Sequence, residues 1–249
     1  MKNVLITGGA KRIGRAIALG LAADGWGVAV HYRGSAEAAA KTVQDIVDAR
    51  GRATALQADL ADVNTLSPLM ERARAEIGPL TALINNASLF ANDDLESLTP
   101  DSWSSHMDTN LRAPLFLAQA FAKQLPESNS GNIINIIDQR VWRLTPRFLS
   151  YTTSKAGLWT LTQTLAQSLA PKIRVNGIGP GPTLSNDRQS NADFQAQVAS
   201  TPLQRQISTE EIRAAVRFIL ASPAMTGQMI ALDSGQHLAW ETPDAVGPE

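Results

Sequence analysis

The sequence predicts an α/β protein in which helices cover both faces of a parallel, doubly wound sheet. Three observations support this fold class. Short apolar runs alternate with longer segments of helical period along the chain. Several of these runs are apolar at nearly every position, as expected of parallel strands that are covered on both faces. A glycine-rich turn joins the first run to the first helical segment, which is typical of such sheets.

The expected strands and helices alternate along the chain. Strands are expected at residues 3–7, 27–32, 53–58, 82–85, 132–137, 174–177 and 229–232. Helices are expected at residues 12–24, 36–50, 63–77, 101–123, 150–170 and 209–221. This alternation produces right-handed crossovers, and ligands of such sheets bind beyond the carboxyl ends of the strands. Residues that directly follow strands are therefore the first candidates for a functional site.

A single domain over residues 1–240 and a polar C-terminal tail over residues 241–249 account for the whole chain. The longest segment without clear regular structure, residues 179–206, contains Pro180, Gly181 and Pro182. This composition suits a mobile lid over a site.

Composition excludes several classes of function. The net charge of −1 lacks the basic bias of a nucleic-acid-binding protein, and no apolar run approaches the length of a membrane span. The first residues enter a strand pattern without a signal-peptide pattern, so we expect a cytoplasmic protein. There is no cysteine, and His31, His106 and His237 are widely separated, so we expect no metal site. Surface or polar-network roles are expected for these histidines.

The glycine-rich turn at residues 7–14 reads Thr-Gly-Gly-Ala-Lys-Arg-Ile-Gly. Gly8 and Gly14 allow a tight turn and a close approach of backbone to a pyrophosphate, which the N–H groups of the following helix can bind. The spacing departs from the common Gly-x-Gly-x-x-Gly pattern, because Arg12 stands where a middle glycine would fall. The turn predicts a dinucleotide cofactor.

The end of the second expected strand indicates which nicotinamide cofactor binds. Residues 31–35 read His-Tyr-Arg-Gly-Ser, and no acid precedes Glu37 to accept a hydrogen bond from a ribose 2′-hydroxyl. Arg33 and Ser35, with Lys11 or Arg12, could instead hold a 2′-phosphate. The alternative is a solvated basic turn. The missing acid and the cations together favour NADP(H).

Asp59 lies at the end of the third expected strand. Its carboxylate could accept a hydrogen bond from the adenine amino group. It could equally be the N-cap of the next helix, since the run Asp-Leu-Ala-Asp precedes that helix.

Tyr151 and Lys155 are spaced i,i+4 in the expected helix 150–170, so they share one helix face. A lysine ammonium beside a phenol stabilises the phenolate and lowers the pKa of the tyrosine from about 10 toward neutrality. The pair therefore predicts an acid–base group. The alternative is an ordinary solvated face, on which this spacing is common.

Taken together, these motifs resemble the short-chain dehydrogenase/reductase family over residues 3–240. The matching residues are Thr7 to Gly14, Asn85-Asn86-Ala87, Asn110, Tyr151 to Lys155 and Pro180-Gly181. The resemblance implies a Rossmann fold and a homo-oligomer, usually a tetramer. It implies that Tyr151 donates a proton, Lys155 lowers its pKa and holds the nicotinamide ribose, and Asn110 anchors a water of the proton relay. It implies cofactor contacts at Ile13, His31, Leu60, Asn86, Ala87, Pro180 and Gly181.

One position departs from the family pattern. The usual catalytic serine lies thirteen residues before the tyrosine, where this chain has Asp138. A serine hydroxyl donates a hydrogen bond to a carbonyl oxygen that becomes negative, whereas an ionised aspartate repels it. At a separation of about 4 Å and an effective dielectric of about 20, the penalty is about 4 kcal/mol. Asp138 therefore suits a C=N bond whose nitrogen must be protonated.

With an aspartate at this position, the chain resembles the pteridine reductase branch of the family. That resemblance implies that Phe90 stacks on a flat bicyclic substrate, and that Ser88 and Arg12 contact the pterin or the cofactor phosphate. Asp138 with Tyr151 would supply the proton to a ring nitrogen. In this branch a basic residue of a partner's C-terminus can reach the substrate, but residues 235–240 contain no arginine and end in Trp240. We expect different substrate contacts there.

The resulting hypothesis is an NADPH-dependent reductase of a pterin-like or dihydropterin substrate. An alternative within the same fold is reduction of a ketone or sugar carbonyl. A third is a non-catalytic NADP-binding protein, whose expected signature is the loss of Tyr151, Lys155 or Asn110, and all three are present.

Overall fold

Seven parallel strands form one sheet in the order β3-β2-β1-β4-β5-β6-β7. The computed structural model describes residues 2–185 and 190–240. The strands are β1 (Asn3–Ile6), β2 (Gly27–Tyr32), β3 (Arg52–Gln57), β4 (Ala82–Asn85), β5 (Gly131–Ile136), β6 (Ile173–Pro180) and β7 (Met229–Leu232). All seven strands were predicted from the sequence, and the order reverses between β1 and β4, where ligands of doubly wound sheets bind.

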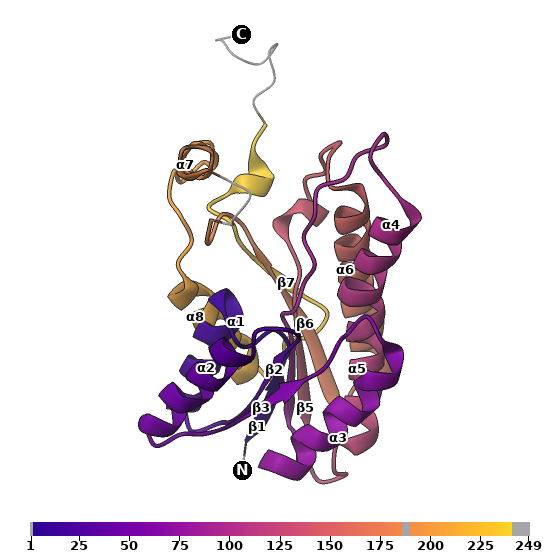
Figure 1. Cartoon of the computed structure of the whole chain (residues 1–249), viewed down its shortest axis with the longest axis vertical. Helices are drawn as coiled ribbons and strands as arrows, with labels where there is room; N and C mark the ends of the chain where they lie inside the picture. Colours follow the sequence, from indigo (N-terminus) through magenta and orange to yellow (C-terminus); the bar gives the residue numbers. More distant parts are fainter. Residues whose placement is uncertain (1, 186–189, 241–249) are drawn as a thin grey trace.

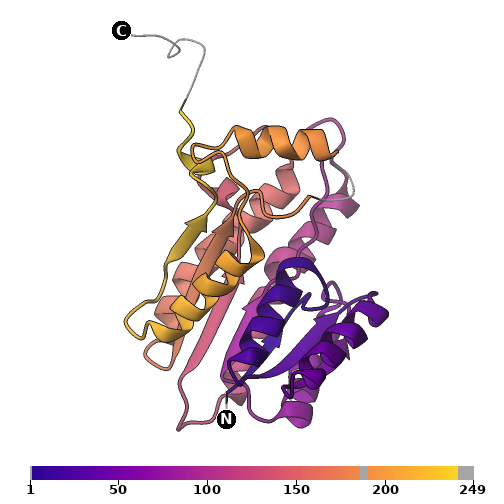
Figure 2. The same ribbon diagram turned by 90° about the vertical axis from the view of Figure 1, so that its left-hand side faces the viewer.

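Helices cover both faces of the sheet (Figures 1 and 2). One layer consists of α1 (Arg12–Ala23), α2 (Ala36–Asp48) and α8 (Thr209–Ala221). The other consists of α3 (Leu66–Ile77), α4 (Pro100–Met107), α5 (Ala113–Gln124) and α6 (Leu149–Leu169). Among the described residues, no helix is both long and apolar enough to cross a bilayer.

The strand residues alternate between two separate cores. In β1, Val4 and Ile6 pack under α1 and α8, whereas Leu5 packs under α3 and α5. All three side chains are fully buried. Because successive side chains of a strand point to opposite faces, burial on both faces favours an apolar residue at every position, which is why strands such as β1 were predictable.

The helix predicted over residues 101–123 is divided in the structure. A π-helical turn, Asp108–Arg112, separates α4 from α5. Pro114 lies in the first turn of α5 and has no N–H to donate to the carbonyl of Asn110 four residues earlier. The ordinary α-helical hydrogen bond cannot form there, and the widened turn places Asn110 in the interior, fully buried.

The prediction that residues 179–206 lack regular structure is wrong in two places. Strand β6 continues to Pro180, and α7 (Asn191–Ala199) lies above the carboxyl end of the sheet (Figures 1 and 2). Ser190 caps α7 by accepting from the N–H of Asp193, and Phe194 and Val198 bury one helix face. Residues 186–189 of the expected lid and the expected tail 241–249 lie outside the described residues.

Candidate active site

Tyr151 and Lys155 lie on the first turns of α6, where the sequence predicted them, and both are buried. The Tyr151 hydroxyl donates to Oδ2 of Asp138 at 2.7 Å. The second oxygen, Oδ1, accepts from the backbone N–H of Arg140 at 2.8 Å. Lys155 Nζ donates to the carbonyl of Ile136 at 2.8 Å, at the end of β5. The structure therefore brings three of the four predicted catalytic side chains together at the carboxyl end of the sheet.

The expectation that the pKa of Tyr151 falls toward neutrality is wrong for this structure. The effect of Lys155 on that pKa stays a prediction. Burial, together with the charge and the hydrogen bond of Asp138, raises the pKa of Tyr151 well above its ordinary value. Burial also lowers the pKa of Lys155 from 10.5 to about 8, although Asp138 opposes this shift. The tyrosine keeps its proton, and the aspartate is its acceptor. The error arose because the sequence does not reveal that Tyr151 bonds an anion rather than the ammonium.

Asn110 lies beside this group, but its amide is fully engaged. Its Oδ1 accepts from the N–H of Leu89, and Nδ2 donates to the carbonyl of Leu89 and to Ser154 Oγ at 3.1 Å. Asn110 thus joins the loop after β4 to the helix that carries Tyr151. The predicted role in anchoring a water of the proton relay stays a prediction.

The glycine-rich turn is held by the loop after β4. The hydroxyl of Thr7 accepts from the N–H groups of Asn86 and Ala87. The side-chain amide of Asn86 donates back to the carbonyls of Thr7 and Gly8 at 2.9 and 3.1 Å. These bonds fix the turn directly at the point where the strand order reverses.

The backbone geometry of the turn accounts for its glycines and for the unusual position of Arg12. Gly8 has φ +62°, and a Cβ on Gly14 would collide with the carbonyl oxygen of Gly8. Arg12 has φ 54°, in the left-handed region that favours glycine, and it occupies the place of the missing middle glycine. Ile13 follows it in the first turn of α1, half-buried against the first core.

His31 holds the same turn from β2. Its Nδ1 accepts from the N–H of Gly8 at 3.0 Å, and Nε2 faces the carbonyl of Ala58 at 3.1 Å. Both contacts require the neutral ring with its proton on Nε2. Burial lowers the pKa of His31 to about 4, which keeps the ring neutral. The predicted polar-network role of His31 is confirmed, and its predicted cofactor contact stays a prediction.

The residues predicted to hold phosphates surround two helix N-termini. Lys11 is the N-cap of α1 and Ser35 is the N-cap of α2, and neither helix has a side-chain cap. Free N–H groups are therefore available at both ends. Arg33 and Lys11 are exposed, and neither forms an ion pair with an acid within the described residues. The Arg12 guanidinium instead donates to the carbonyls of Leu184 and Ser185 at 3.0 and 2.6 Å.

Asp59 follows β3 at the same end of the sheet and is exposed. Its Oδ1 accepts from the N–H of Ala61 at 3.0 Å, whereas Asp62 caps the following 3₁₀ turn. The carboxyl group therefore supports the turn rather than capping the helix, and its expected contact with adenine stays a prediction. Leu60 beside it is buried in the second core.

Two phenylalanine rings lie next to Tyr151. Phe90 stacks on Phe148 with ring centroids 4.7 Å apart and planes at 9°, and it meets the Tyr151 ring edge-on at 4.6 Å. Phe148 has φ 60° and precedes α6. We call Phe90 and Phe148 the aromatic platform. Ser88, the other predicted substrate contact, is exposed two residues before Phe90, and its hydroxyl donates to the carbonyl of Leu89.

A buried network that the sequence analysis did not identify supports the aromatic platform. The Asp93 carboxylate accepts from the hydroxyl of Ser150, from the N–H of Ser150 and from the hydroxyl of Ser102. Nδ1 of His106 lies 2.8 Å from Ser150 Oγ, and Nε2 accepts from the N–H of Ala91. The network ties the Phe90 loop to the start of α6. Each of its residues is separately ordinary in sequence, so only their meeting in space reveals it.

Strand β6 ends at Pro180, and Gly181 follows it beside the last strand. Gly181 donates its N–H to Leu232 at 2.9 Å, and a Cβ on Gly181 would press on the backbone of Asp233. Asp233 accepts from Nδ1 of His237 at 2.6 Å. These contacts bring the end of the described chain to the carboxyl edge of the sheet.

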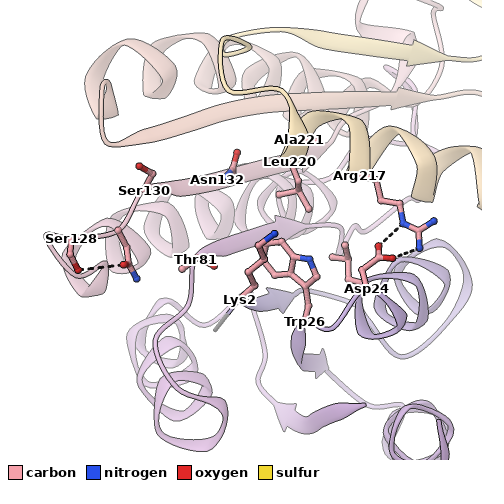
Figure 3. A pocket seen from close by; sticks show the side chains of 12 residues that line it. Lys2, Asp24, Trp26, Thr81, Ser128, Ser130, Asn132, Arg217, Leu220 and Ala221 are labelled. Atoms are coloured by element: carbon pink, nitrogen blue, oxygen red, sulfur yellow. Dashed lines mark hydrogen bonds and ion pairs between the residues drawn. The ribbon is translucent and has the colours of Figure 1, made fainter. Parts of the chain in front are cut away.

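A cavity of about 530 Å³ lies at the opposite end of the sheet (Figure 3). It is lined by Lys2, Trp26, Thr81 and Ser130, each of which directly precedes a strand. In the close-up, Arg217 forms an ion pair with Asp24 across the helices α8 and α1. Because ligands of these sheets bind beyond the carboxyl ends, this cavity is separate from the candidate active site.

Comparison with known proteins agrees with this geometry. The family model for short chain dehydrogenases matches residues 2–196. A 3-oxoacyl-[acyl-carrier-protein] reductase of Synechocystis sp. is 32% identical over 235 residues, which are 93% of this chain and 95% of that protein.

Two solved structures are more similar still. FolM alternative dihydrofolate reductase 1 from Brucella canis, complexed with NADP, is 48% identical with a TM-score of 0.96, over 98% of this chain and 97% of that one. The protein of the same name from Brucella suis, also with NADP, is 48% identical with a TM-score of 0.95, over 98% of both chains. This chain belongs to the short-chain dehydrogenase/reductase family of oxidoreductases.

Proposed function

We propose that the protein is an NADPH-dependent reductase of a pteridine or dihydropterin C=N bond. The observation that carries this proposal is the hydrogen bond from Tyr151 to Asp138, which puts a carboxylate where a serine would serve a carbonyl substrate. The likeness to FolM alternative dihydrofolate reductases at 48% identity supports the same substrate class.

NADPH would bind across the glycine-rich turn. The uncapped N-termini of α1 and α2 offer N–H groups to its phosphates, and Arg33 with Ser35 suits a 2′-phosphate. Two solved relatives at this identity contain NADP. The bound cofactor supplies a hydride to a ring carbon of the substrate.

The chain's own residues would handle the proton. Tyr151 gives its hydroxyl proton to the ring nitrogen, so that an N–H bond forms as the O–H bond breaks. The ammonium of Lys155 stabilises the phenolate that remains. Asp138 accepts hydrogen bonds from N–H groups of the heterocycle and so orients it. The aromatic platform provides a surface on which a flat ring can stack.

The test is to follow NADPH oxidation with dihydrobiopterin, dihydrofolate and several simple ketones. The proposal expects kcat/KM for the dihydropterins to exceed that for the ketones by about 100-fold or more. Equal or faster turnover of ketones would instead establish a carbonyl reductase.

Two further properties are proposed, the first from the family resemblance and the second from the N-terminal sequence pattern and the lack of a long apolar run. We propose a homotetramer and a cytoplasmic location. Sedimentation velocity of the purified protein tests the first, since a tetramer has four times the 26.6 kDa mass of one chain. Cell fractionation tests the second.

A further inference from the structure

The loop between Asp138 and Phe148 carries three arginines and no acid. These are Arg140, Arg143 and Arg147. Over residues 2–185 and 190–240, no carboxylate lies within ion-pair distance of any of the three guanidinium groups. The side of the active site next to the aromatic platform is therefore positively charged.

Arg140 is fixed against the aromatic platform. Its guanidinium carbon lies 5.0 Å from the ring centroid of Phe148, which in turn stacks on Phe90. One terminal nitrogen donates to Thr145 Oγ1 at 2.6 Å. The Nε–H is shielded from solvent and has no acceptor among the described residues. Arg140 thus stands one ring beyond Phe90 with hydrogen-bonding capacity left over.

The other two arginines differ in their contacts. Arg143 donates to the carbonyl of Gln236 at 3.0 Å, which joins the loop to the end of the described chain. Arg147 is exposed and directly precedes Phe148. Arg140 therefore lies over the Phe148 ring, whereas Arg147 is the exposed residue directly before Phe148 in the chain.

None of the nearby acids in the described residues forms an ion pair with these guanidinium groups. The oxygens of Asp138 accept from Tyr151 and from the N–H of Arg140. The Asp93 carboxylate is bonded to Ser150 beneath the platform, and Asp233 is bonded to His237. An anionic group of a ligand that extends past Phe90 would therefore meet guanidinium groups that are not already paired with a carboxylate of the described residues.

Resting on the proposed function, we propose that Arg140 and Arg147 form an anion subsite that selects pterins with an anionic side chain. A substituent carried on a pterin that lies on Phe90 must extend past the Phe148 ring to reach Arg140. Guanidinium groups bind carboxylates and phosphates through paired, charge-assisted hydrogen bonds. The side chain would accordingly end in a carboxylate, as in a folate, or in a phosphate.

The test compares three substrates with the purified enzyme and NADPH. Dihydrofolate carries carboxylates, a phosphorylated dihydropterin carries a phosphate, and dihydrobiopterin carries an uncharged side chain. The variants are Arg140→Gln and Arg147→Gln. Arg74→Gln is the control, because Arg74 is an exposed arginine of α3 near the opposite end of the sheet and its loss changes the net charge equally.

In each loop variant, we expect kcat/KM for an anionic substrate, relative to that for dihydrobiopterin, to fall about tenfold. The same ratio should fall in the wild type as salt rises, and should not change in the control. Loss confined to dihydrofolate identifies a carboxylate, and loss confined to the phosphorylated substrate identifies a phosphate.

Arg147→Gln keeps the test valid if Arg140→Gln disturbs the loop, because Arg147 is the more exposed of the two. A wild-type enzyme that reduces dihydrobiopterin, but whose ratio changes in neither variant, overturns the anion subsite and leaves the proposed function standing. A wild-type enzyme that reduces none of the three substrates overturns both.

Discussion

The hydroxyl of Tyr151 donates its hydrogen bond to the carboxylate of Asp138, not to a serine and not toward Lys155. This bond ties the proton donor to an anion, and it keeps the proton on the tyrosine because both burial and the negative charge oppose ionisation. The tyrosine can then lose its proton only to a basic group that replaces or offsets the carboxylate. A heterocycle satisfies that requirement when its ring nitrogen accepts the proton and its adjacent N–H groups donate hydrogen bonds to Asp138.

Replacing Asp138 by serine should therefore change substrate preference. In Asp138→Ser, kcat/KM for dihydropterins is expected to fall about 100-fold, because the carboxylate no longer orients the heterocycle. The value for simple ketones should rise, because a hydroxyl donates to the developing oxyanion where the carboxylate repelled it. Steady-state rates with both substrate classes check this. Unchanged selectivity in a variant with an unchanged melting temperature would contradict the electrostatic argument.

Lys155 provides a prediction about pH. Its pKa falls from 10.5 to about 8 on folding, because burial disfavours the ammonium. Between these two values the unfolded chain binds more protons, so the free energy of unfolding rises with pH there. Below pH 8 the free energy of unfolding is reduced by the full cost of burying the Lys155 ammonium, which is at most about 3 kcal/mol.

In Lys155→Met, the rise in stability between pH 8 and pH 10.5 should disappear, and activity should be lost. Urea denaturation at several pH values measures the first effect. The matched control is Lys123→Met, since Lys123 is exposed on α5 and should leave the pH dependence as it is in the wild type. A Lys155→Met protein whose stability still rises over that interval would show that another group is responsible.

The sequence was sufficient for the sheet because several strands are buried on both faces and are therefore apolar at nearly every position. In β1, Val4, Leu5 and Ile6 are all apolar for this reason. It was insufficient for α7, whose signals are a single cap at Ser190 and two buried side chains, Phe194 and Val198. A helix of nine residues with so few large apolar side chains resembles a loop in composition.

The active site was likewise predictable only in part. Tyr151, Lys155 and Asp138 were predictable because the first two are neighbours on one helix turn and the third occupies a fixed place in a family pattern. Phe148 was not, because its contact with Phe90 joins residues far apart in the chain and depends on a left-handed backbone conformation. The direction of the Tyr151 pKa was wrong because it depends on which partner the hydroxyl contacts.

The buried network beneath the platform yields a prediction about Ser150. Its hydroxyl donates to Asp93 and lies 2.8 Å from Nδ1 of His106, so Ser150→Ala leaves two buried polar groups with one partner fewer. We expect a loss of about 1–3 kcal/mol in the free energy of unfolding. Because Ser150 joins α6 to the Phe90 loop, KM for a dihydropterin should rise severalfold, more than kcat falls.

The same variant should unfold at a higher pH on acidification. Burial raises the pKa of Asp93, but the hydrogen bonds from Ser150 and Ser102 outweigh it and hold that pKa below its ordinary value. This stabilisation is present at neutral pH and is lost as pH falls through the lowered pKa. Thr153→Ala is the control, since Thr153 is exposed on the same helix. Equal acid sensitivity in the two variants would remove the role assigned to Ser150.

Gly14 tests whether the glycine-rich turn binds the cofactor. A Cβ there would overlap the carbonyl oxygen of Gly8 and come within 2.5 Å of Asn86 Nδ2. Helix α1 must then shift away from the turn, and its N–H groups lose their alignment toward a phosphate. In Gly14→Ala we expect the dissociation constant for NADPH to rise at least about tenfold and stability to fall by about 1–3 kcal/mol.

Gly34 is the matched control for this change, because it follows the neighbouring strand β2 and a Cβ there meets nothing within 4 Å. Gly34→Ala should keep both NADPH affinity and the free energy of unfolding close to the wild-type values. Fluorescence titration with NADPH and urea denaturation measure the two quantities for each variant. If Gly14→Ala bound NADPH as tightly as Gly34→Ala, the contact between α1 and the turn would matter only for folding, and the phosphate site would have to lie elsewhere along the carboxyl edge of the sheet.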